Sequence, residues 1–307
     1  MVKTYSQLYL DVRKMLMATE DAQSAGFITR QLLCHVSGMT QEQIVADREK
    51  YAPEDVCAEL EFAAARILKG EPLAYLLGEW EFYGLPLYVD KNVLIPRDDT
   101  CAVVSLAVNH GLFLGKDPRI LDLCTGSGCI GLAIASRVKD ARVTLADISR
   151  DALAVAKKNI TRNHMSGKVS CIQADALAKP AAFLGKFDMI VSNPPYITTR
   201  EMEELPINVR DYEPRLALHG GDDGLIFYES IAKNYAQALK PGGLLAFEFG
   251  MGQGDDVCRI LEKNQYTILE RSRDYNDRER AVIARYGRKE EENGNKKDIL
   301  RSPNSRI

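Results

Sequence analysis

The segment Asn193-Pro194-Pro195-Tyr196 places an amide, two rigid prolines and an aromatic ring directly after the apolar run 187–192. An amide or exocyclic amino nitrogen is a poor nucleophile because its lone pair is delocalised, so a catalyst must hold its hydrogens with well-placed acceptors. The Asn193 side-chain oxygen and the Pro194 carbonyl can be these acceptors, since both prolines fix φ in advance. Tyr196 can supply a flat apolar face. Asn-Pro alone is typical of an ordinary turn, whereas the whole segment favours methylation of a planar nitrogen held by these four residues.

A glycine-rich turn lies between a buried strand that begins at residue 119 and a helix expected at 129–139. Its G-x-G-x-x-G pattern fits nicotinamide dinucleotides as well as S-adenosylmethionine. Cysteines flank the turn, and small, soft side chains there suit close packing better than catalysis. We expect the cofactor to contact Cys124, Thr125, Gly126, Ser127 and Gly128.

Two later strands each end in an acid. Strand 142–147 ends at Asp147, which suits the two ribose hydroxyls of a nucleoside. Strand 169–175 ends at Asp175, which can accept a hydrogen bond from an adenine amino group, with Ala176 beside the base. These acids, followed by Asn193 at the next strand end as a further cofactor contact, favour a methyltransferase over a dehydrogenase. The alternative is that the acids merely cap helices.

The chain resembles the protein-glutamine N5-methyltransferases that modify peptide-chain release factors, the HemK/PrmC family, from about residue 5 to residue 286. Four blocks carry the resemblance: GEPLAYLLGEWEFYG at 70–84, VLIPR at 93–97, ILDLCTGSG at 120–128 and SNPPYI at 192–197; a fifth, at 211–224, strengthens it. The resemblance implies methyl transfer from S-adenosyl-L-methionine to the side-chain amide nitrogen of the glutamine in a release factor's Gly-Gly-Gln motif. Asn193, Pro194 and Tyr196 would be the catalytic residues.

Two places depart from the family pattern. After Ile-Pro-Arg the family usually continues Pro-Glu-Thr-Glu, whereas this chain reads Asp98-Asp99-Thr100-Cys101. Asp99 can replace the family's glutamate, but the last acid has become a cysteine. The family also tends to place a tryptophan after the third-strand acid, where this chain has Ala176, so any stacking on adenine must come from elsewhere.

Composition agrees with a cofactor-binding enzyme. The 307 residues, 46% of them hydrophobic, can bury one large core and a smaller one. The seven cysteines are scattered without a C-x-x-C pair, which predicts reduced thiols and neither disulfides nor a metal site. There is no apolar stretch of about 18 residues and no signal pattern, so we expect a cytoplasmic protein that does not associate with membranes.

The chain divides into regions by pattern. Residues 1–75 carry apolar residues, Phe27 among them, at helical spacing and predict a small helical domain. Residues 76–95 predict a β-hairpin connector, and 96–286 predict a Rossmann-like α/β methyltransferase domain with a doubly wound sheet. The tail 287–307 is polar and we expect it to be disordered.

Two segments of the α/β region lie outside the cofactor motifs. The loop 198–224 is long and directly follows the catalytic turn, so we expect it to cover the substrate. The segments 267–270 and 280–284 predict a terminal antiparallel hairpin. Arg278 and Arg280 could contact the substrate, but exposed charges are commoner on a hairpin, and we interpret both arginines in that way.

Other functions compete with this interpretation. A nucleic-acid adenine N6-methyltransferase could hold an adenine amino group in the same four residues. However, the formal charge is −3, and residues 1–75 hold 8 Lys/Arg against 11 Asp/Glu, where a nucleic-acid partner would favour a basic face. A non-catalytic scaffold has no reason to retain the catalytic turn. We therefore expect a monomeric enzyme whose helical domain engages release factors and which binds no nucleic acid directly.

Overall fold

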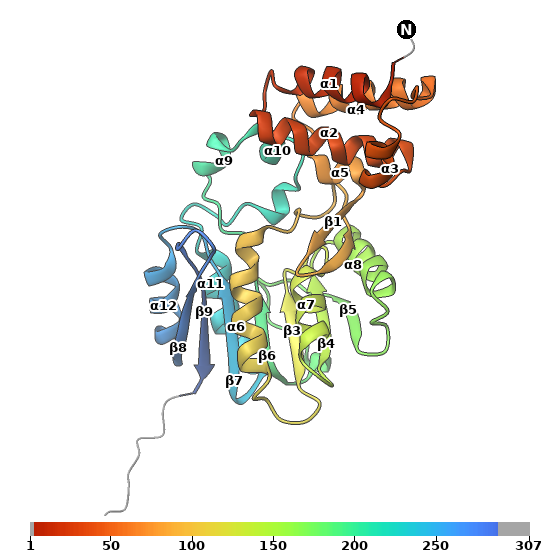
Figure 1. The fold of residues 1–307 in the computed structure, drawn as a ribbon. Coiled ribbons are helices and arrows are strands. Elements are labelled where there is room, and N and C mark those ends of the chain that lie inside the picture. Colours follow the sequence, from red (N-terminus) through yellow and green to blue (C-terminus); the bar gives the residue numbers. More distant parts are fainter. Residues whose placement is uncertain (1–2, 288–307) are drawn as a thin grey trace, which may run out of the picture.

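The computed structural model describes residues 3–287, so the tail expected to be disordered lies outside the described residues, apart from Gly287. An all-helical region lies at one end of the molecule, above an α/β region (Figure 1). The buried side chains of the helical region, including Leu8, Leu32 and Leu60, form one apolar cluster. The helices are α1 (Tyr5–Leu16), α2 (Ala22–Ser37), α3 (Gln41–Ala46), α4 (Glu54–Leu68) and α5 (Leu73–Leu77).

The helix ends follow from local chemistry. Thr4 caps α1 in a reciprocal capping box with Gln7, and the Asp21 carboxylate accepts hydrogen bonds from two backbone amides at the start of α2. Gly38 ends α2 in a left-handed conformation, with φ of 66°. Phe27, one of the apolar residues at helical spacing, is 42% exposed, because α2 packs on α1 and α4 through other residues.

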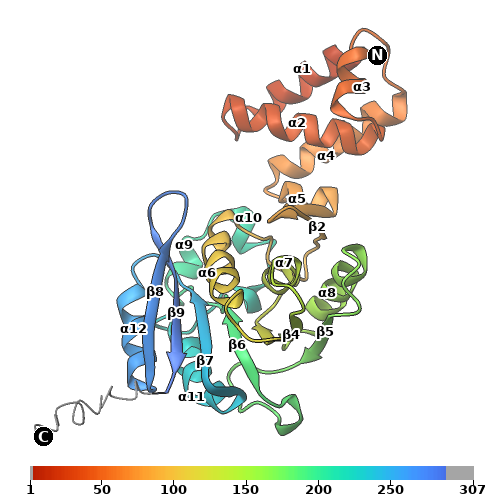
Figure 2. The same ribbon diagram turned by 60° about the horizontal axis from the view of Figure 1, so that its bottom comes forward.

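A β-hairpin joins the two regions, as predicted (Figure 2). Strands β1 (Glu79–Phe82) and β2 (Leu85–Tyr88) are antiparallel, with Phe82 opposite Leu85. The inward side chains of Phe82 and Leu87 join a core cluster of the α/β region. The hairpin is therefore packed on the sheet domain and is not a free linker.

The α/β region is built on a seven-stranded sheet with the order β5-β4-β3-β6-β7-β9-β8. The first five of these strands run parallel, and β9 is antiparallel to both of its neighbours. The strands are β3 (Arg119–Leu123), β4 (Arg142–Asp147), β5 (Val169–Gln173), β6 (Phe187–Ser192), β7 (Leu239–Glu248), β8 (Tyr266–Arg273) and β9 (Glu279–Tyr286).

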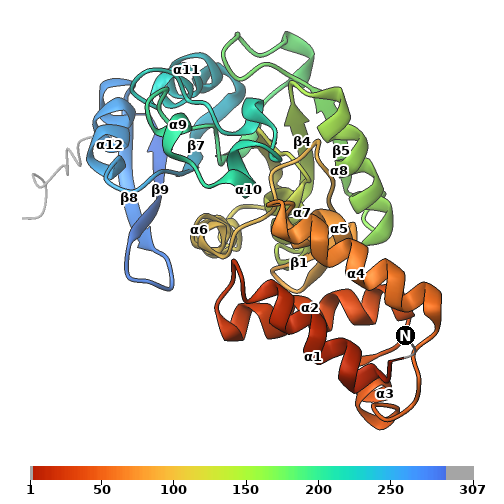
Figure 3. The same cartoon turned by 90° about the horizontal axis from the view of Figure 1, so that it is seen from above.

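Helices cover both faces of this sheet, which confirms the predicted doubly wound α/β class (Figure 3). On one face α6 (Cys101–Gly111), α7 (Cys129–Arg137) and α8 (Arg150–Arg162) pack on one apolar cluster. On the other face, α11 (Ile226–Asn234) and α12 (Gly254–Lys263) pack on a second cluster. Two short helices, α9 (Glu201–Glu204) and α10 (Ile207–Arg210), and four 3-10 turns, at 98–100, 182–184, 215–217 and 235–238, lie in the connections.

Within residues 3–287, no helix is long and apolar enough to cross a membrane.

Candidate active site

The glycine-rich turn between β3 and α7 has a backbone that few residues adopt. Cys124, Gly126 and Gly128 all have positive φ, at 61°, 54° and 85°. Such a conformation is costly for a side chain other than glycine, so the surrounding structure must hold Cys124 in place. A Cβ at Gly131 would lie 2.2 Å from Leu145 Cδ2, so only glycine lets α7 approach the sheet this closely.

The buried carboxyl of Asp122 holds this turn from behind. Its Oδ2 accepts hydrogen bonds from Thr125 Oγ1 at 2.5 Å and from the Gly131 amide at 2.8 Å. Burial raises the pKa of Asp122 to about 7, against the lowering effect of these hydrogen bonds. Asp122 therefore joins the start of the turn to the first turn of α7.

Asp147, at the end of β4, connects the turn to the next strand. Its Oδ2 accepts from the Gly126 amide and its Oδ1 from the Ser149 amide, both at 2.9 Å. Burial raises the pKa of Asp147, and these backbone hydrogen bonds oppose the shift. Ser149 itself caps α8. Each carboxylate oxygen keeps a lone pair for a ligand hydroxyl.

A cavity of about 190 Å³ opens at the carboxyl ends of the parallel strands, the expected ligand position in such a sheet. A Cβ built on Gly126 would meet nothing within 4 Å, so the turn leaves open space at this point. Of the residues expected to contact the cofactor or substrate, the cavity is lined by Cys124, Thr125, Gly126, Ser127, Asp147, Asp175, Ala176, Asn193 and Pro195.

Three of the expected site residues do not line this cavity: Gly128, Pro194 and Tyr196. At Gly128 a Cβ would lie 2.9 Å from Leu145 Cδ1, so its missing side chain serves helix packing. Tyr196 packs against the core cluster beside α11, and its carbonyl accepts a hydrogen bond from Gln253 Nε2 at 3.1 Å. A Cβ at Gly224 would lie 2.3 Å from that carbonyl oxygen, so the returning chain packs directly on the backbone of Tyr196.

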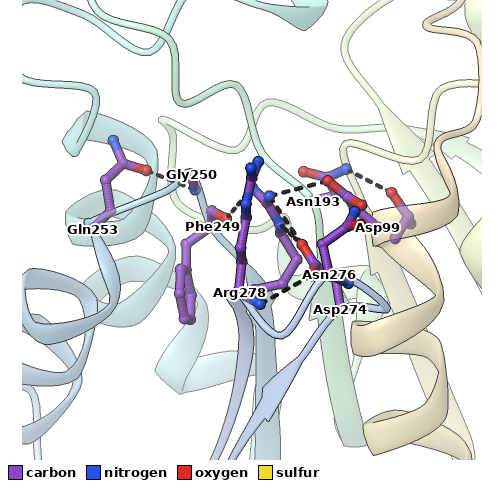
Figure 4. A network of polar contacts seen from close by, with 10 residues as sticks. Asp99, Asn193, Phe249, Gly250, Gln253, Asp274, Asn276 and Arg278 are labelled. Atoms are coloured by element: carbon purple, nitrogen blue, oxygen red, sulfur yellow. Dashed lines mark hydrogen bonds and ion pairs between the residues drawn. The ribbon is translucent and has the colours of Figure 1, made fainter.

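A network of polar residues lies beside Asn193 (Figure 4). The Asn193 Nδ2 donates a long hydrogen bond, 3.5 Å, to Thr100 Oγ1. Behind it Arg280 pairs with Asp99 at 3.0 Å and with Asp274 at 3.1 Å. The interpretation of Arg280 as an exposed hairpin charge is therefore wrong: only 7% of the residue is exposed, because its two carboxylate partners draw it inward. Asp99 takes part in this network, whereas Cys101 is half-buried beside the core.

The loop 198–224 closes one side of the cavity. Pro214, Leu216 and Ala217 line it, and the buried Glu213 forms an ion pair with Arg97 from the opposite side. The same loop reaches the helical region, where the Tyr212 hydroxyl donates to the Lys69 carbonyl at 3.1 Å.

Some lining residues were not among those expected from the sequence. Arg97 and Thr100 follow the hairpin; the VLIPR block at 93–97 was a signal for Arg97, and Thr100 lies three residues after it. Ile148 and Phe227 also line the cavity and offer the apolar and aromatic surface that Ala176 lacks. No local pattern marks Phe227, since α11 reaches the cavity only through the tertiary fold.

Comparison with known proteins gives matches in both regions. Residues 8–78 match the PrmC N-terminal domain family, and residues 106–207 match the methyltransferase small domain family. A release factor glutamine methyltransferase from Clostridium acetobutylicum is 42% identical over 216 residues, covering 70% of this chain and 75% of that protein. A protein of the same name from Geobacter sulfurreducens is 36% identical over 280 residues, covering 91% of this chain and 95% of that protein.

A further relative from Chlorobaculum tepidum, also named release factor glutamine methyltransferase, is 38% identical over 257 residues and covers 82% of this chain and 87% of that protein. The two family models match the helical region and the part of the sheet region that contains the cofactor turn. The chain belongs to the release factor glutamine methyltransferase family.

Proposed function

We propose that the protein transfers a methyl group from S-adenosyl-L-methionine to the side-chain amide nitrogen of the glutamine in the Gly-Gly-Gln motif of peptide-chain release factors. One observation carries the proposal: Asn193 and Pro195 form a wall of the same cavity that the glycine-rich turn lines, together with Asp147 at the end of β4 and Asp175 two residues after the end of β5. An amide-holding turn and a nucleoside-binding turn therefore face one enclosed space. Membership of the family supplies the substrate.

The residues at the cavity suit the cofactor. S-adenosyl-L-methionine, when bound, supplies an electrophilic methyl group on its sulfonium. The open space at Gly126 leaves room for its methionine portion. Asp147 lines the cavity and keeps lone pairs that would accept from the ribose hydroxyls, and Asp175 and Ala176, which also line it, would lie along the edge of the adenine. Phe227 and Ile148 provide apolar surface for the base.

At the reacting centre, Asn193 Oδ1 would accept from one hydrogen of the glutamine amide. The backbone carbonyl of the next residue, Pro194, which is not among the cavity-lining residues, would accept from the other. These contacts would orient the nitrogen toward the methyl group that the bound cofactor would supply, and proximity would contribute most of the acceleration. No strong general base is needed, because the proton can leave to water after transfer. Tyr196 supports the turn through its packing against the core.

The helical region serves as the surface that engages the release factor away from the glutamine, since one side chain offers little area for specificity. The loop 198–224 touches both this region and the cavity, so it is placed to meet the bound substrate. Residues 1–75 and 96–286 act as the recognition and catalytic units, joined by the hairpin.

The test is to follow a labelled methyl group. A folded release factor should accept one methyl on the glutamine of its Gly-Gly-Gln loop, identified by mass spectrometry of the peptide. A short peptide with that loop should react more slowly, because it lacks the remote contacts. Duplex DNA should take no label. Label in adenine, with the release factor unmodified, would favour the nucleic-acid adenine methyltransferase instead.

A further inference from the structure

A buried acid lies beside the reacting centre and outside the cavity. Glu248 is the last residue of β7 and is 2% exposed. In the parallel register of β6 and β7, Ser192 pairs with Phe247, so residue 248 lies next to Asn193. Side chains alternate along a strand, and Leu244 and Ala246 face the cluster under α6. Glu248 therefore points toward the start of that helix, where Thr100 lies.

The carboxyl of Glu248 is close to the two polar groups behind the reacting centre. The side chains of Thr100 and Asn193 both lower its pKa through hydrogen bonding, and Asn193 Nδ2 also donates to Thr100 Oγ1. Thr100 and Asn193 line the cavity, whereas Glu248 does not. The carboxyl therefore makes no direct contact with the cavity, and its contacts toward the cavity run through these two side chains.

The orientation of the Asn193 amide decides what it offers to the substrate. Only its oxygen can accept a hydrogen bond, while its nitrogen can only donate. Thr100 Oγ1 and the Glu248 carboxyl can both accept from Nδ2. This arrangement turns Nδ2 toward these two groups and leaves Oδ1 free to accept from a substrate.

Stability does not explain an acid in this position. Burial raises the pKa of Glu248 to about 7, and its Oε2 has no hydrogen-bond partner among the described residues. The nearby Arg280 favours the charged form, but it already pairs with Asp99 and Asp274. A buried polar atom without a partner costs free energy, and an apolar residue of similar volume is often as stable or more so.

We infer that Glu248 is a positioning residue for methyl transfer, which holds the Asn193 amide with its oxygen toward the substrate nitrogen. This inference rests on the proposed function. Glu248 itself touches neither substrate nor cofactor. It acts on the orientation of Asn193 directly and through the Thr100 hydroxyl.

The first experiment uses Glu248→Met, which keeps volume but removes the acceptor. We expect kcat on a folded release factor to fall by about tenfold to a hundredfold, by analogy with the loss of one preorganised polar partner. The Kd for S-adenosylmethionine should stay within about twofold, and the melting temperature should be unchanged or higher. Glu248→Gln retains one acceptor and should recover most of the lost kcat.

Tyr228→Phe is the matched control. The Tyr228 hydroxyl donates to the backbone carbonyl of Glu248 at 3.1 Å, so its loss disturbs the same strand end without touching the carboxyl. We expect kcat to remain near the wild-type value. A Glu248→Met protein with wild-type kcat would overturn the inference. So would one that fails to fold, because the carboxyl would then serve the fold and not the reaction.

A double-mutant cycle gives the sharper test. If Glu248 acts through Asn193, adding Glu248→Met to Asn193→Ala should lower kcat little further, since the group being positioned is already gone. If the two reductions in kcat multiply in the double variant, Glu248 acts independently of Asn193. That result would overturn the inference while leaving the proposed function intact. If the wild-type enzyme leaves the glutamine unmodified, the proposed function itself fails.

Discussion

The helical region and the sheet region bury different kinds of side chain. In residues 3–77 the buried interior is apolar except for Thr29, whose hydroxyl donates to the Ala25 carbonyl of its own helix at 2.7 Å. The sheet region buries ionisable groups as well, among them Asp122, Glu248 and Arg280, each at the end of a strand or one residue from it. The buried interior of the helical region therefore mainly stabilises the fold. The sheet region holds buried polar groups in place at a cost in stability.

The largest effect on stability should come from the helical core. Leu60 is fully buried in α4, so Leu60→Ala should lower the free energy of unfolding of this region by about 2–5 kcal/mol. Denaturant unfolding would measure the loss. Phe62→Ala on the same helix is the control, because Phe62 is 65% exposed and its truncation should change stability by less than about 0.5 kcal/mol. Weaker cofactor binding in Leu60→Ala would contradict the separation of the two regions.

Asn193→Ala should affect the reaction and not the fold. Removing one acceptor at the reacting centre should lower kcat by about a hundredfold, equivalent to about 2.7 kcal/mol in the barrier. Cofactor affinity and melting temperature should change little. Steady-state kinetics and calorimetry on the same preparation would decide, and near-normal turnover would remove Asn193 from the reacting centre.

Asp147→Ala should weaken S-adenosylmethionine binding by about 1.5–3 kcal/mol, the scale for losing hydrogen bonds to a charged group. Titration calorimetry would measure the loss. Asp151→Ala is a matched control, since Asp151 is an exposed acid in the first turn of α8. Equal affinities in the two variants would argue against a ribose contact.

The buried acids should make stability depend on pH. The pKa of Asp122 is raised from 3.8 to about 7 in the folded protein, so the folded state holds a proton that the unfolded chain has lost. Its contribution is fully present below pH 3.8 and is lost as pH rises through about 7. Asp122→Asn cannot titrate and should remove up to about 1.4 kcal/mol per pH unit from the slope. Identical slopes for variant and wild type would mean that Asp122 is already ionised in the folded state.

Local patterns predicted those elements whose structure is decided locally. Strand β4 has the predicted bounds 142–147, and the glycine-rich turn lies between strand and helix as expected. These succeed because strand alternation, glycine and helix caps depend on neighbours in sequence. Most of the expected residues line the cavity, because the carboxyl ends of parallel strands meet at one edge of the sheet.

Burial of charge was not predictable in this way. Arg280 looks like a hairpin charge until the fold places Asp99 of a distant segment 3.0 Å away. Glu248 ends an apolar run that looks like any buried strand. Only the pairing of β6 with β7 in the folded protein brings it next to Asn193. Phe27 is the opposite case, an apolar side chain that is exposed. Helical spacing alone cannot tell which face of α2 the neighbouring helices cover.

The loop that closes the cavity is tied together at its base. The Ile197 amide donates to the Leu218 carbonyl at 2.9 Å, and the Gly220 amide returns a bond to the Ile197 carbonyl at 2.8 Å. These two hydrogen bonds fix the base of the loop. Residues can therefore be inserted or deleted between α9 and α10 without displacing Tyr196. Since the entropy of closing a loop grows only slowly with its length, such insertions are inexpensive. The molecule can thus adapt this part of its surface to release factors of different shape while the reacting turn keeps one geometry.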